Sequence, residues 1–410
     1  GLCAPTYASH FFFKFGSQDN DKLGIKGKDK EGKWFSTGTH QQKYLDPRER
    51  GDWRGYFQVC VKIARAVKRL HAAGLAHSDL SYKNVLVDPT TGSAAVIDID
   101  GLVVPGKFPP DVIGTPDFIA PEVVATLNLK VDDKARKLPR IETDRHALAV
   151  LIYMYMLYRH PLKGGLIIPA QTEEERQNLE MGSKALFIEH PTDTRNRPNL
   201  KDVKKGDLPF ADVTKLPYTI TGPYLKALFD RAFVDGLHNP SLRPLADEWE
   251  SALIKTVDLM QPCTNPGCTH KWYVFDNTNK PKCPFCGTAF SGTLPVLNLY
   301  TNYGKGVYRD DKHRLMVYAN QYLYKWHANR NTVLSPNLSQ EDMKPVGYFS
   351  LHNGKWLFVN QKLATLTDVT KDGAPRPIPI GGQVELAEGQ KLMLDSGDGG
   401  RVVGVQMVKA

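Results

Sequence analysis

Long apolar stretches are missing from this sequence of 410 residues. The longest uninterrupted apolar run covers residues 147–158 and has twelve residues, whereas a helix that crosses a bilayer needs about 20. A buried core helix therefore explains this run better than a membrane span. No secretory signal pattern opens the printed chain either. These features predict a cytoplasmic protein that has no membrane partner.

Cysteine is also scarce, with six residues in the chain. Four of them form two close pairs, Cys263 with Cys268 and Cys283 with Cys286. Such a pattern favours a reducing compartment and one metal site over a disulfide framework.

The sequence contains no internal repeat and no low-complexity tract. The formal net charge is +9, but the basic residues are scattered. The densest basic run, residues 22–33, also contains Asp29 and Glu31, which is typical of a solvated loop. A nucleic-acid partner is therefore disfavoured.

Helical periodicity is clearest over residues 53–73, where apolar residues recur at steps of three and four. Asp52 is suited to cap the start of this helix, and Gly74 to end it. The apolar run 147–158 predicts a second helix, which Thr143 and Asp144 would cap. Helices are also expected over 224–233 and 246–258.

Strands are expected at both ends of the chain. Residues 11–13 could form a short strand. From about residue 293 the chain becomes β-rich, with alternating patterns over 314–326 and 355–359. Residues 349–351 and 355–359 flank His352-Asn353-Gly354, which predicts a tight hairpin.

Three short motifs follow the first helix. Residues 77–84 read His-Ser-Asp-Leu-Ser-Tyr-Lys-Asn, residues 97–101 read Ile-Asp-Ile-Asp-Gly, and residues 114–122 read Gly-Thr-Pro-Asp-Phe-Ile-Ala-Pro-Glu. Phosphoryl transfer needs a carboxylate that orients the attacking hydroxyl and oxygen ligands that hold Mg²⁺. A hairpin with arms at 85–87 and 95–97 would return Asp98 to the loop that carries Asp79 and Asn84.

In this order the motifs resemble the eukaryotic-like Ser/Thr protein kinase family, whose loop reads His-Arg-Asp-Leu-x-x-x-Asn. The resemblance covers residues 40–258, roughly the C-lobe of a kinase. It implies that Asp79 is the catalytic base and that Asn84 and Asp98 hold Mg²⁺ or Mn²⁺ beside ATP. His77 would anchor the loop. Asp100 is the alternative to Asp98.

The resemblance implies structural roles for further residues. Glu122 would pair with Arg243, and Asp144 would hold the backbone of the catalytic loop. Thr115 matches the position that favours Ser/Thr over Tyr in a protein substrate. Lys83 could substitute for the γ-phosphate lysine that the family has where this chain has Ser81.

Two departures bear on regulation. Ser78 replaces the Arg that contacts a phosphorylated activation loop, and no Ser, Thr or Tyr lies between Leu102 and Ile113. The sequence therefore predicts a kinase that activation-loop phosphorylation does not switch.

The ATP-covering lobe is not found in the printed sequence. The 410 residues contain no G-x-G-x-x-G and no Val-Ala-x-Lys motif, and residues 1–15 resemble the end of a hinge strand. We expect a truncated kinase, or one whose N-lobe lies outside this numbering. A piece this short is expected to bind ATP weakly and to have little activity.

The cysteine segment contains Cys283-Pro284-Phe285-Cys286-Gly287, which is typical of a knuckle that directs two thiolates at one metal. Four thiolates suit tetrahedral Zn²⁺ in a structural zinc ribbon. Redox cysteines and an iron–sulfur cluster are the alternatives. His270 is a weaker ligand candidate than any of the four cysteines.

Residues 293–410 predict an all-β sandwich with a faint resemblance to forkhead-associated (FHA) domains, carried by residues 356–360, 382–386 and 389–392. The predicted fold is multidomain α+β: a remnant of the N-lobe and hinge at 1–50, a mainly helical kinase C-lobe at 51–258, a zinc ribbon at 259–292 and the sandwich at 293–410. This order resembles bacterial kinases of tellurite-resistance-type clusters. That resemblance implies as partners a von Willebrand A-type protein and a metal-dependent Ser/Thr phosphatase.

Three functions remain open at this point. The first is a Ser/Thr protein kinase, which the intact Asp79, Asn84 and Asp98 favour. The second is a pseudokinase scaffold, which the absent lysine at Ser81 and the absent N-lobe favour. The third is a small-molecule phosphotransferase, against which the motif at 114–122 argues.

Overall fold

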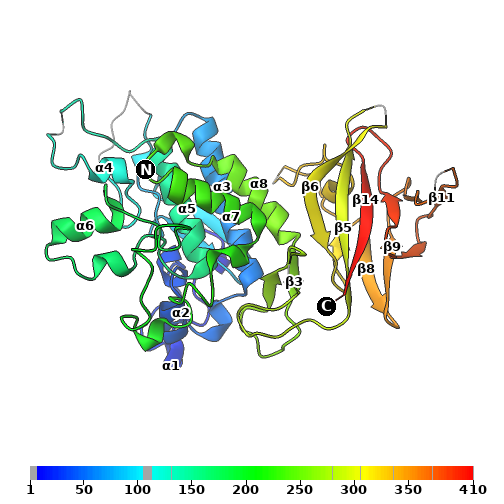
Figure 1. Cartoon of the computed structure of the whole chain (residues 1–410), viewed down its shortest axis with the longest axis horizontal. Coiled ribbons are helices and arrows are strands. Elements are labelled where there is room, and N and C mark those ends of the chain that lie inside the picture. The colour runs from blue at the N-terminus through cyan, green and yellow to red at the C-terminus, as the bar shows by residue number, and fades with distance from the viewer. Residues whose placement is uncertain are drawn as a thin grey trace. The chain divides into compact units, whose positions relative to one another are not determined.

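The computed structural model describes residues 7–104, 113–130, 132–278, 280–304, 306–335, 337–371 and 373–409. The chain divides into two compact units. The first comprises Gly1–Val257 and Gly267–Tyr273, and the second Asp258–Pro266 and Val274–Ala410. Figure 1 shows that helices dominate the first unit and strands the second.

The first unit is built mainly from helices. They are α1 (Gln18–Asp21), α2 (Gly38–Tyr44), α3 (Trp53–Ala72), α4 (Pro121–Val124), α5 (Ile141–Leu157), α6 (Glu173–Met181), α7 (Pro223–Asp230) and α8 (Ala246–Val257). Strands β1 (Val85–Asp88) and β2 (Ser93–Val96) form an antiparallel hairpin, as predicted. Helix α3 packs against α5 and α8, and α7 packs against α8, so these helices lie side by side in Figure 1.

Helix α5 is the centre of this unit. From Thr143 to Leu157 every residue except Arg145 is buried, which explains why the sequence shows an apolar run rather than a one-sided stripe. The predicted start at residue 147 is wrong, because the helix begins at Ile141. The backbone N–H of Arg140 donates to the Thr143 hydroxyl (2.9 Å). Thr143 therefore closes the first turn from inside the helix and does not precede it.

Helix α3 confirms the predicted helix over 53–73. The Asp52 carboxylate accepts the backbone N–H of Gly55 (3.0 Å) and caps the first turn. Gly74 has a positive φ of 73° just beyond the last turn, a conformation that glycine adopts without strain.

Two other predictions for this unit need correction. Residues 11–13 do not form a strand: a 3₁₀ turn, Ser9–Phe11, precedes a single bridge between Phe12 and Asp29. The predicted helix over 224–233 ends at Asp230 and continues as a π turn, Arg231–Asp235. Part of the predicted hinge remnant, residues 1–6, lies outside the described residues.

A buried ion cluster fixes the amino-terminal part of the first unit. Lys30 Nζ lies 2.9 Å from Glu49 Oε2 and 3.0 Å from Asp88 Oδ1, and the three side chains are 4%, 2% and 1% exposed. The Asp88 carboxylate also accepts the hydroxyl of Thr90 (2.7 Å). Two carboxylates offset the cost of burying one ammonium group, so segments 58 residues apart are held together.

The second part of the chain is built mainly from strands. The elements after α8 are β3 (Met260–Pro262), β4 (Trp272–Val274), β5 (Thr293–Asn302), β6 (Tyr308–Met316), β7 (Tyr322–Leu323), α9 (Lys325–Ala328), β8 (Gly347–His352), β9 (Lys355–Asn360), β10 (Thr367–Asp368), β11 (Arg376–Pro377), β12 (Gln383–Glu385), β13 (Lys391–Met393) and β14 (Arg401–Lys409). One antiparallel sheet has the order β11-β10-β13-β14-β5-β6, and a second has the order β12-β9-β8-β7. The prediction that the chain is β-rich after residue 293 is confirmed. The FHA-like sandwich stays a prediction.

The predicted hairpin of β8 and β9 is confirmed. Asn353 (φ 50°) and Gly354 (φ 76°) occupy its two-residue turn, the conformation that a type I′ turn requires. The predicted strand pattern over 314–326 is interrupted. Helix α9 starts at Lys325 because the His327 imidazole accepts the N–H of Tyr324 (3.1 Å) and closes a helical turn.

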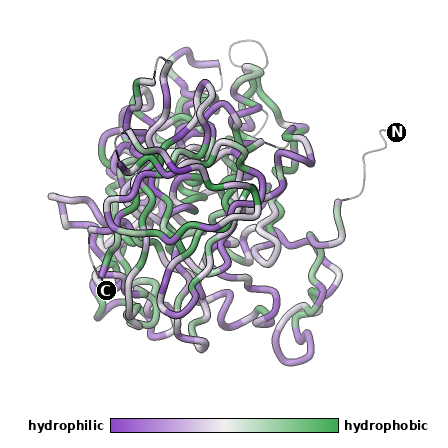
Figure 2. Tube along the Cα trace, turned by 90° about the vertical axis from the view of Figure 1, so that its right-hand side faces the viewer, coloured by the Kyte–Doolittle hydropathy of each residue, from purple (hydrophilic) through white to green (hydrophobic). Residues whose placement is uncertain are grey.

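Figure 2 shows hydrophilic and hydrophobic residues interspersed along the trace. In the described ranges, no helix is both long enough and apolar enough to cross a membrane.

Candidate active site and metal centre

The Asp79 carboxylate is held by two hydrogen bonds from separate motifs. The backbone N–H of Thr115 donates to Oδ1, and the Asn84 side-chain amide donates to Oδ2 (3.0 Å). The same amide donates to the carbonyl oxygen of Asp79 (2.8 Å). Asp79 therefore has a fixed orientation on the loop between α3 and β1, while its side chain is still partly exposed.

The hairpin brings the second motif to this loop. The N–H of Ile97 donates to the carbonyl oxygen of Asn84 (3.0 Å). The Ile97 carbonyl lies 2.9 Å from His77 Nε2. Because Asp98 follows Ile97, the backbone places it next to Asn84, as the sequence predicted.

Asp98 has a left-handed backbone (φ 58°, ψ 50°) and an exposed side chain. A non-glycine residue in this region is strained, and such strain is concentrated at functional sites. Asp100 is also exposed, but it lies in a 3₁₀ turn, Ile99–Gly101. Within the described residues, neither carboxylate has a hydrogen-bond or ion-pair partner.

Asp144 anchors the backbone of the loop from inside α5. Its side chain is 2% exposed. Oδ2 accepts the N–H of His77 (2.7 Å), and Oδ1 accepts the N–H of Ser78 (3.2 Å). The helix thus presents a carboxylate to two buried donors that would otherwise be unsatisfied. These are the contacts that the resemblance implied for this residue.

Ser78 ties the loop to the segment that follows Asp98. It has a positive φ of 67°, and its hydroxyl donates to the carbonyl oxygen of Gly101 (3.0 Å). Ala76 and Val103 exchange two backbone hydrogen bonds of 2.9 and 2.8 Å. The loop at 76–78 therefore holds the start of this segment through three hydrogen bonds of its own. Residues 105–112, most of the stretch predicted to lack a phosphorylation site, lie outside the described residues.

The structure brings Glu122 and Arg243 together. Arg243 Nη1 and Nη2 lie 2.8 and 2.7 Å from the two carboxylate oxygens of Glu122. By contrast, the side chain of Lys83 is exposed and Ser81 is fully buried. The Ser81 hydroxyl accepts the N–H of Lys83 (3.2 Å), so it stabilises its own turn.

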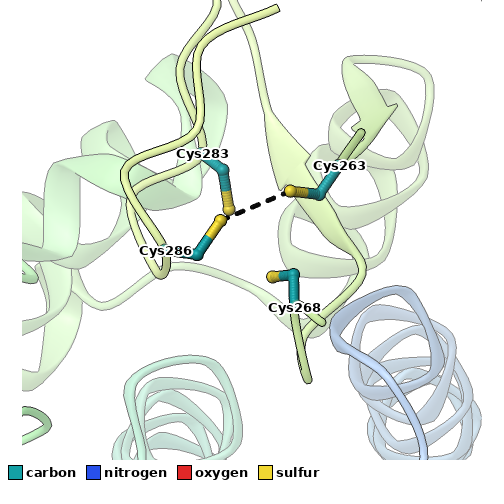
Figure 3. Close-up of side chains that lie close together, drawn as sticks. All are labelled: Cys263, Cys268, Cys283 and Cys286. Atoms are coloured by element: carbon teal, nitrogen blue, oxygen red, sulfur yellow. Dashed lines mark hydrogen bonds between the residues drawn. The ribbon is translucent and has the colours of Figure 1, made fainter. Parts of the chain in front are cut away.

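The four paired cysteines form one cluster. The sulfur atoms of Cys263, Cys268, Cys283 and Cys286 all lie within 4.8 Å of one another, and Figure 3 shows their side chains converging. Tetrahedral Zn²⁺ with Zn–S bonds of about 2.3 Å separates its sulfur ligands by about 3.8 Å. The Cys263 and Cys286 sulfurs are 3.5 Å apart. Among the described cysteines none forms a disulfide, so the cluster is consistent with zinc binding.

The knuckle around Cys286 favours the thiolate form that a metal needs. Burial on its own would raise the pKa of the Cys286 thiol. Hydrogen bonds from Thr288 and from the Cys263 and Cys283 thiols lower that pKa to about 6. Gly287 has a φ of 76° and donates its N–H to the Cys283 carbonyl (2.9 Å), which closes the turn.

Sequence reasoning missed two contacts of the loop. His71 Nε2 lies 3.2 Å from Asp144 Oδ2; a basic residue in the last turn of a helix was its only signal. Ser78 was noted for the arginine it replaces, whereas its hydroxyl makes a specific contact. That contact depends on a left-handed backbone, which the residue type did not indicate.

Comparison with known proteins agrees with this geometry. Residues 38–212 match the family model of the protein kinase domain. Serine/threonine-protein kinase PkaB of Streptomyces coelicolor is 30% identical over 139 residues, which cover 31% of this chain and 31% of that protein. Citron rho-interacting kinase of Rattus norvegicus is 27% identical over 149 residues, which cover 35% of this chain and 6% of that protein.

The similarity to solved structures is weaker. A Toxoplasma gondii rhoptry antigen kinase domain aligns with 16% identity and a TM-score of 0.30, over 49% of this chain and 46% of that one. This likeness is too low to add to the argument. The family match and the curated relatives lead to one conclusion: residues 38–212 form a protein kinase domain homologous to those of Ser/Thr protein kinases.

Proposed function

We propose that this chain carries the phosphoryl-transfer machinery of a Ser/Thr protein kinase, which moves the γ-phosphate of ATP to a protein hydroxyl. The observation that supports this most is the orientation of Asp79 by Thr115 and Asn84. An oriented carboxylate beside the segment that would meet the substrate can accept the hydroxyl proton as the oxygen attacks.

The residues around Asp79 suit a hard cation. The amide nitrogen of Asn84 donates to Asp79, which fixes the orientation of the amide. In the described part of the chain nothing donates to its Oδ1. That oxygen and the exposed Asp98 carboxylate are ligands that Mg²⁺ prefers. Mg²⁺ bound with ATP would neutralise charge on the phosphates. Asn84 and Asp98 would hold it, and Lys83 could reach a phosphate from the same loop.

The C-terminal modules would choose the partners of this kinase. We propose an FHA-like docking role for the β domain and a structural zinc ribbon at the cysteine cluster. A bacterial stress system of the tellurite-resistance type, with a von Willebrand A-type protein and a metal-dependent phosphatase, is the context that the module order favours.

Phosphoryl transfer by the full chain tests the proposal. With labelled ATP at millimolar concentration, Mg²⁺ and casein, we expect label on casein or on the chain itself. Asp79→Asn and Asp98→Asn are each expected to lower the rate at least about 100-fold. Asp100→Asn is the matched control and is expected to stay within about threefold of the wild-type rate, since Asp98 is the assigned ligand.

Two results would argue against this proposal. A large loss of activity in Asp100→Asn, with normal activity in Asp98→Asn, would assign the metal to Asp100 instead of Asp98. No label in any sample, in a chain that is folded by circular dichroism and that binds ATP at the concentration used, would favour the pseudokinase scaffold. Ser81 is buried and cannot replace a phosphate-binding lysine, which favours that alternative.

A further inference from the structure

An open groove of about 300 Å³ lies in the first unit, between the segment after α5 and residues 198–211. Ile167, Ile188, Val203 and Ala211 give it an apolar lining. Its size is at the lower end of the range for ligand pockets, enough for one or two apolar side chains.

Exposed apolar residues lie on the chain segments that line this groove. Ile168 lines the groove and is 58% exposed. Leu200 and Leu208, within or next to the same chain segment, are 46% and 38% exposed. Single exposed apolar residues are ordinary on a protein surface. A group of several on the segments that line an apolar groove indicates a binding site.

A positive rim borders this groove. Lys204 lines it, Lys201 and Lys205 flank it in sequence, and all three side chains are exposed. Over the described ranges of the chain, none of these three lysines forms an ion pair. Asp202 is the exposed carboxylate of the lining. The segment 201–205 carries three lysines and this one aspartate, so the segment is positively charged.

The other charged groups of the lining are already engaged. Lys163 pairs with Asp117 (2.6 Å), and Arg159 pairs with Glu189 (2.6 Å). The Asp207 carboxylate accepts the hydroxyl of Thr39 (2.6 Å). Lys204 is therefore a lining cation that is available to a ligand, and Lys201 and Lys205 lie close to it in sequence.

The wall of the groove also holds the segment that contacts the candidate base. Besides the ion pair of Lys163 with Asp117, His160 Nε2 lies 3.0 Å from the Asp117 carbonyl oxygen. His160 Nδ1 accepts the N–H of Leu162 (3.1 Å), so Nε2 carries the proton and donates. Asp117 is two residues from Thr115, whose N–H donates to Asp79. A peptide in the groove would thus lie next to the segment that leads to the candidate active site.

We propose that this lysine-rimmed groove binds an acidic peptide segment of the protein substrate. An apolar side chain of the peptide would enter the apolar lining, and carboxylates on either side of it would meet Lys201, Lys204 and Lys205. The substrate role rests on the proposed kinase activity, whereas binding of the peptide does not.

Peptide binding to the full chain, measured without ATP, tests this inference. The probe is a fluorescent twelve-residue peptide with Leu and Ile among Glu and Asp residues. The control peptide has Gln and Asn in place of the acids. By fluorescence anisotropy we expect the acidic peptide to bind at least about tenfold more tightly than the neutral one, and more weakly as salt rises.

Variants locate the binding site. The pair Lys201→Glu with Lys204→Glu is expected to weaken binding of the acidic peptide at least about tenfold, and Ile168→Ser about threefold. Lys28→Glu, which reverses an exposed lysine elsewhere in the same unit, is the matched control and should leave binding unchanged. Melting temperatures check that each variant is folded.

The outcomes separate this inference from the proposed function. Equal binding of the two peptides, or equal losses in Lys28→Glu and the groove variants, would overturn the groove assignment even if the chain transfers phosphate. Groove-dependent peptide binding by a chain that transfers no phosphate would support the groove assignment. It would contradict only the kinase proposal.

Discussion

Arg243→Ala is expected to lower the free energy of unfolding of the first unit by about 3–5 kcal/mol, because it breaks a buried ion pair from one side. The Arg243 side chain is 1% exposed and forms a two-pronged contact with Glu122. It also donates to the carbonyl oxygens of Gly236, Leu237 and Glu142. Removing the guanidinium leaves these acceptors and a largely buried carboxylate without their donor.

Urea unfolding of the full chain, followed by tryptophan fluorescence, measures this effect. Arg231→Ala is the matched control, because Arg231 pairs with Glu248 at the surface, where the side chains are 40% and 36% exposed. An exposed ion pair contributes about 0–1 kcal/mol to the free energy of unfolding. Similar losses in the two variants would show that burial of the Arg243 pair does not set its contribution.

Removing the metal from the four-cysteine cluster is expected to unfold residues 263–286. Structural zinc sites bind Zn²⁺ with a free energy of about 10–16 kcal/mol at neutral pH. Because the site forms only on folding, that binding free energy also stabilises the fold. The effect should reach α3, because the His270 carbonyl accepts the N–H of Trp53 (3.0 Å). The His270 ring also packs against Tyr158 and Phe210, with ring centroids 5.6 and 5.9 Å apart.

Metal analysis and amide hydrogen exchange check this prediction. The purified chain should hold about one zinc ion, the number that one set of four thiolates can bind. Treatment with a chelator should speed exchange in the cysteine segment and at the start of α3. Cys286→Ser should lose the metal, whereas His270→Gln should keep it. Loss of zinc in His270→Gln, or iron in place of zinc, would contradict the assignment of the four cysteines as a zinc site.

Local signals in the sequence predicted much of the first unit. The apolar stripe and Asp52 predicted α3, and the spacing of the motifs predicted the hairpin that returns Asp98 to Asn84. Both depend on neighbours within about 20 residues, where periodicity and turn chemistry are informative. The start of α5 was predicted too late, since residues 142–146 are polar and Thr143 caps the helix from its third position.

Contacts between distant segments could not be predicted in the same way. The pairs Lys163–Asp117 and Arg159–Glu189 join loops whose positions follow from the packed fold. Nothing in the local sequence distinguishes these lysines and arginines from exposed ones. The lysine-rimmed groove is a property of that packing, so only the folded chain reveals it.

The buried cluster of Lys30, Glu49 and Asp88 limits how this sequence can evolve. A neutral residue at position 30 alone would leave two buried carboxylates without their cation. In an alignment of related chains, positions 30, 49 and 88 are therefore expected to change together. Recombination between relatives should be tolerated poorly when the crossover falls between 50 and 87, because it would separate the lysine of one parent from the aspartate that its own lineage selected.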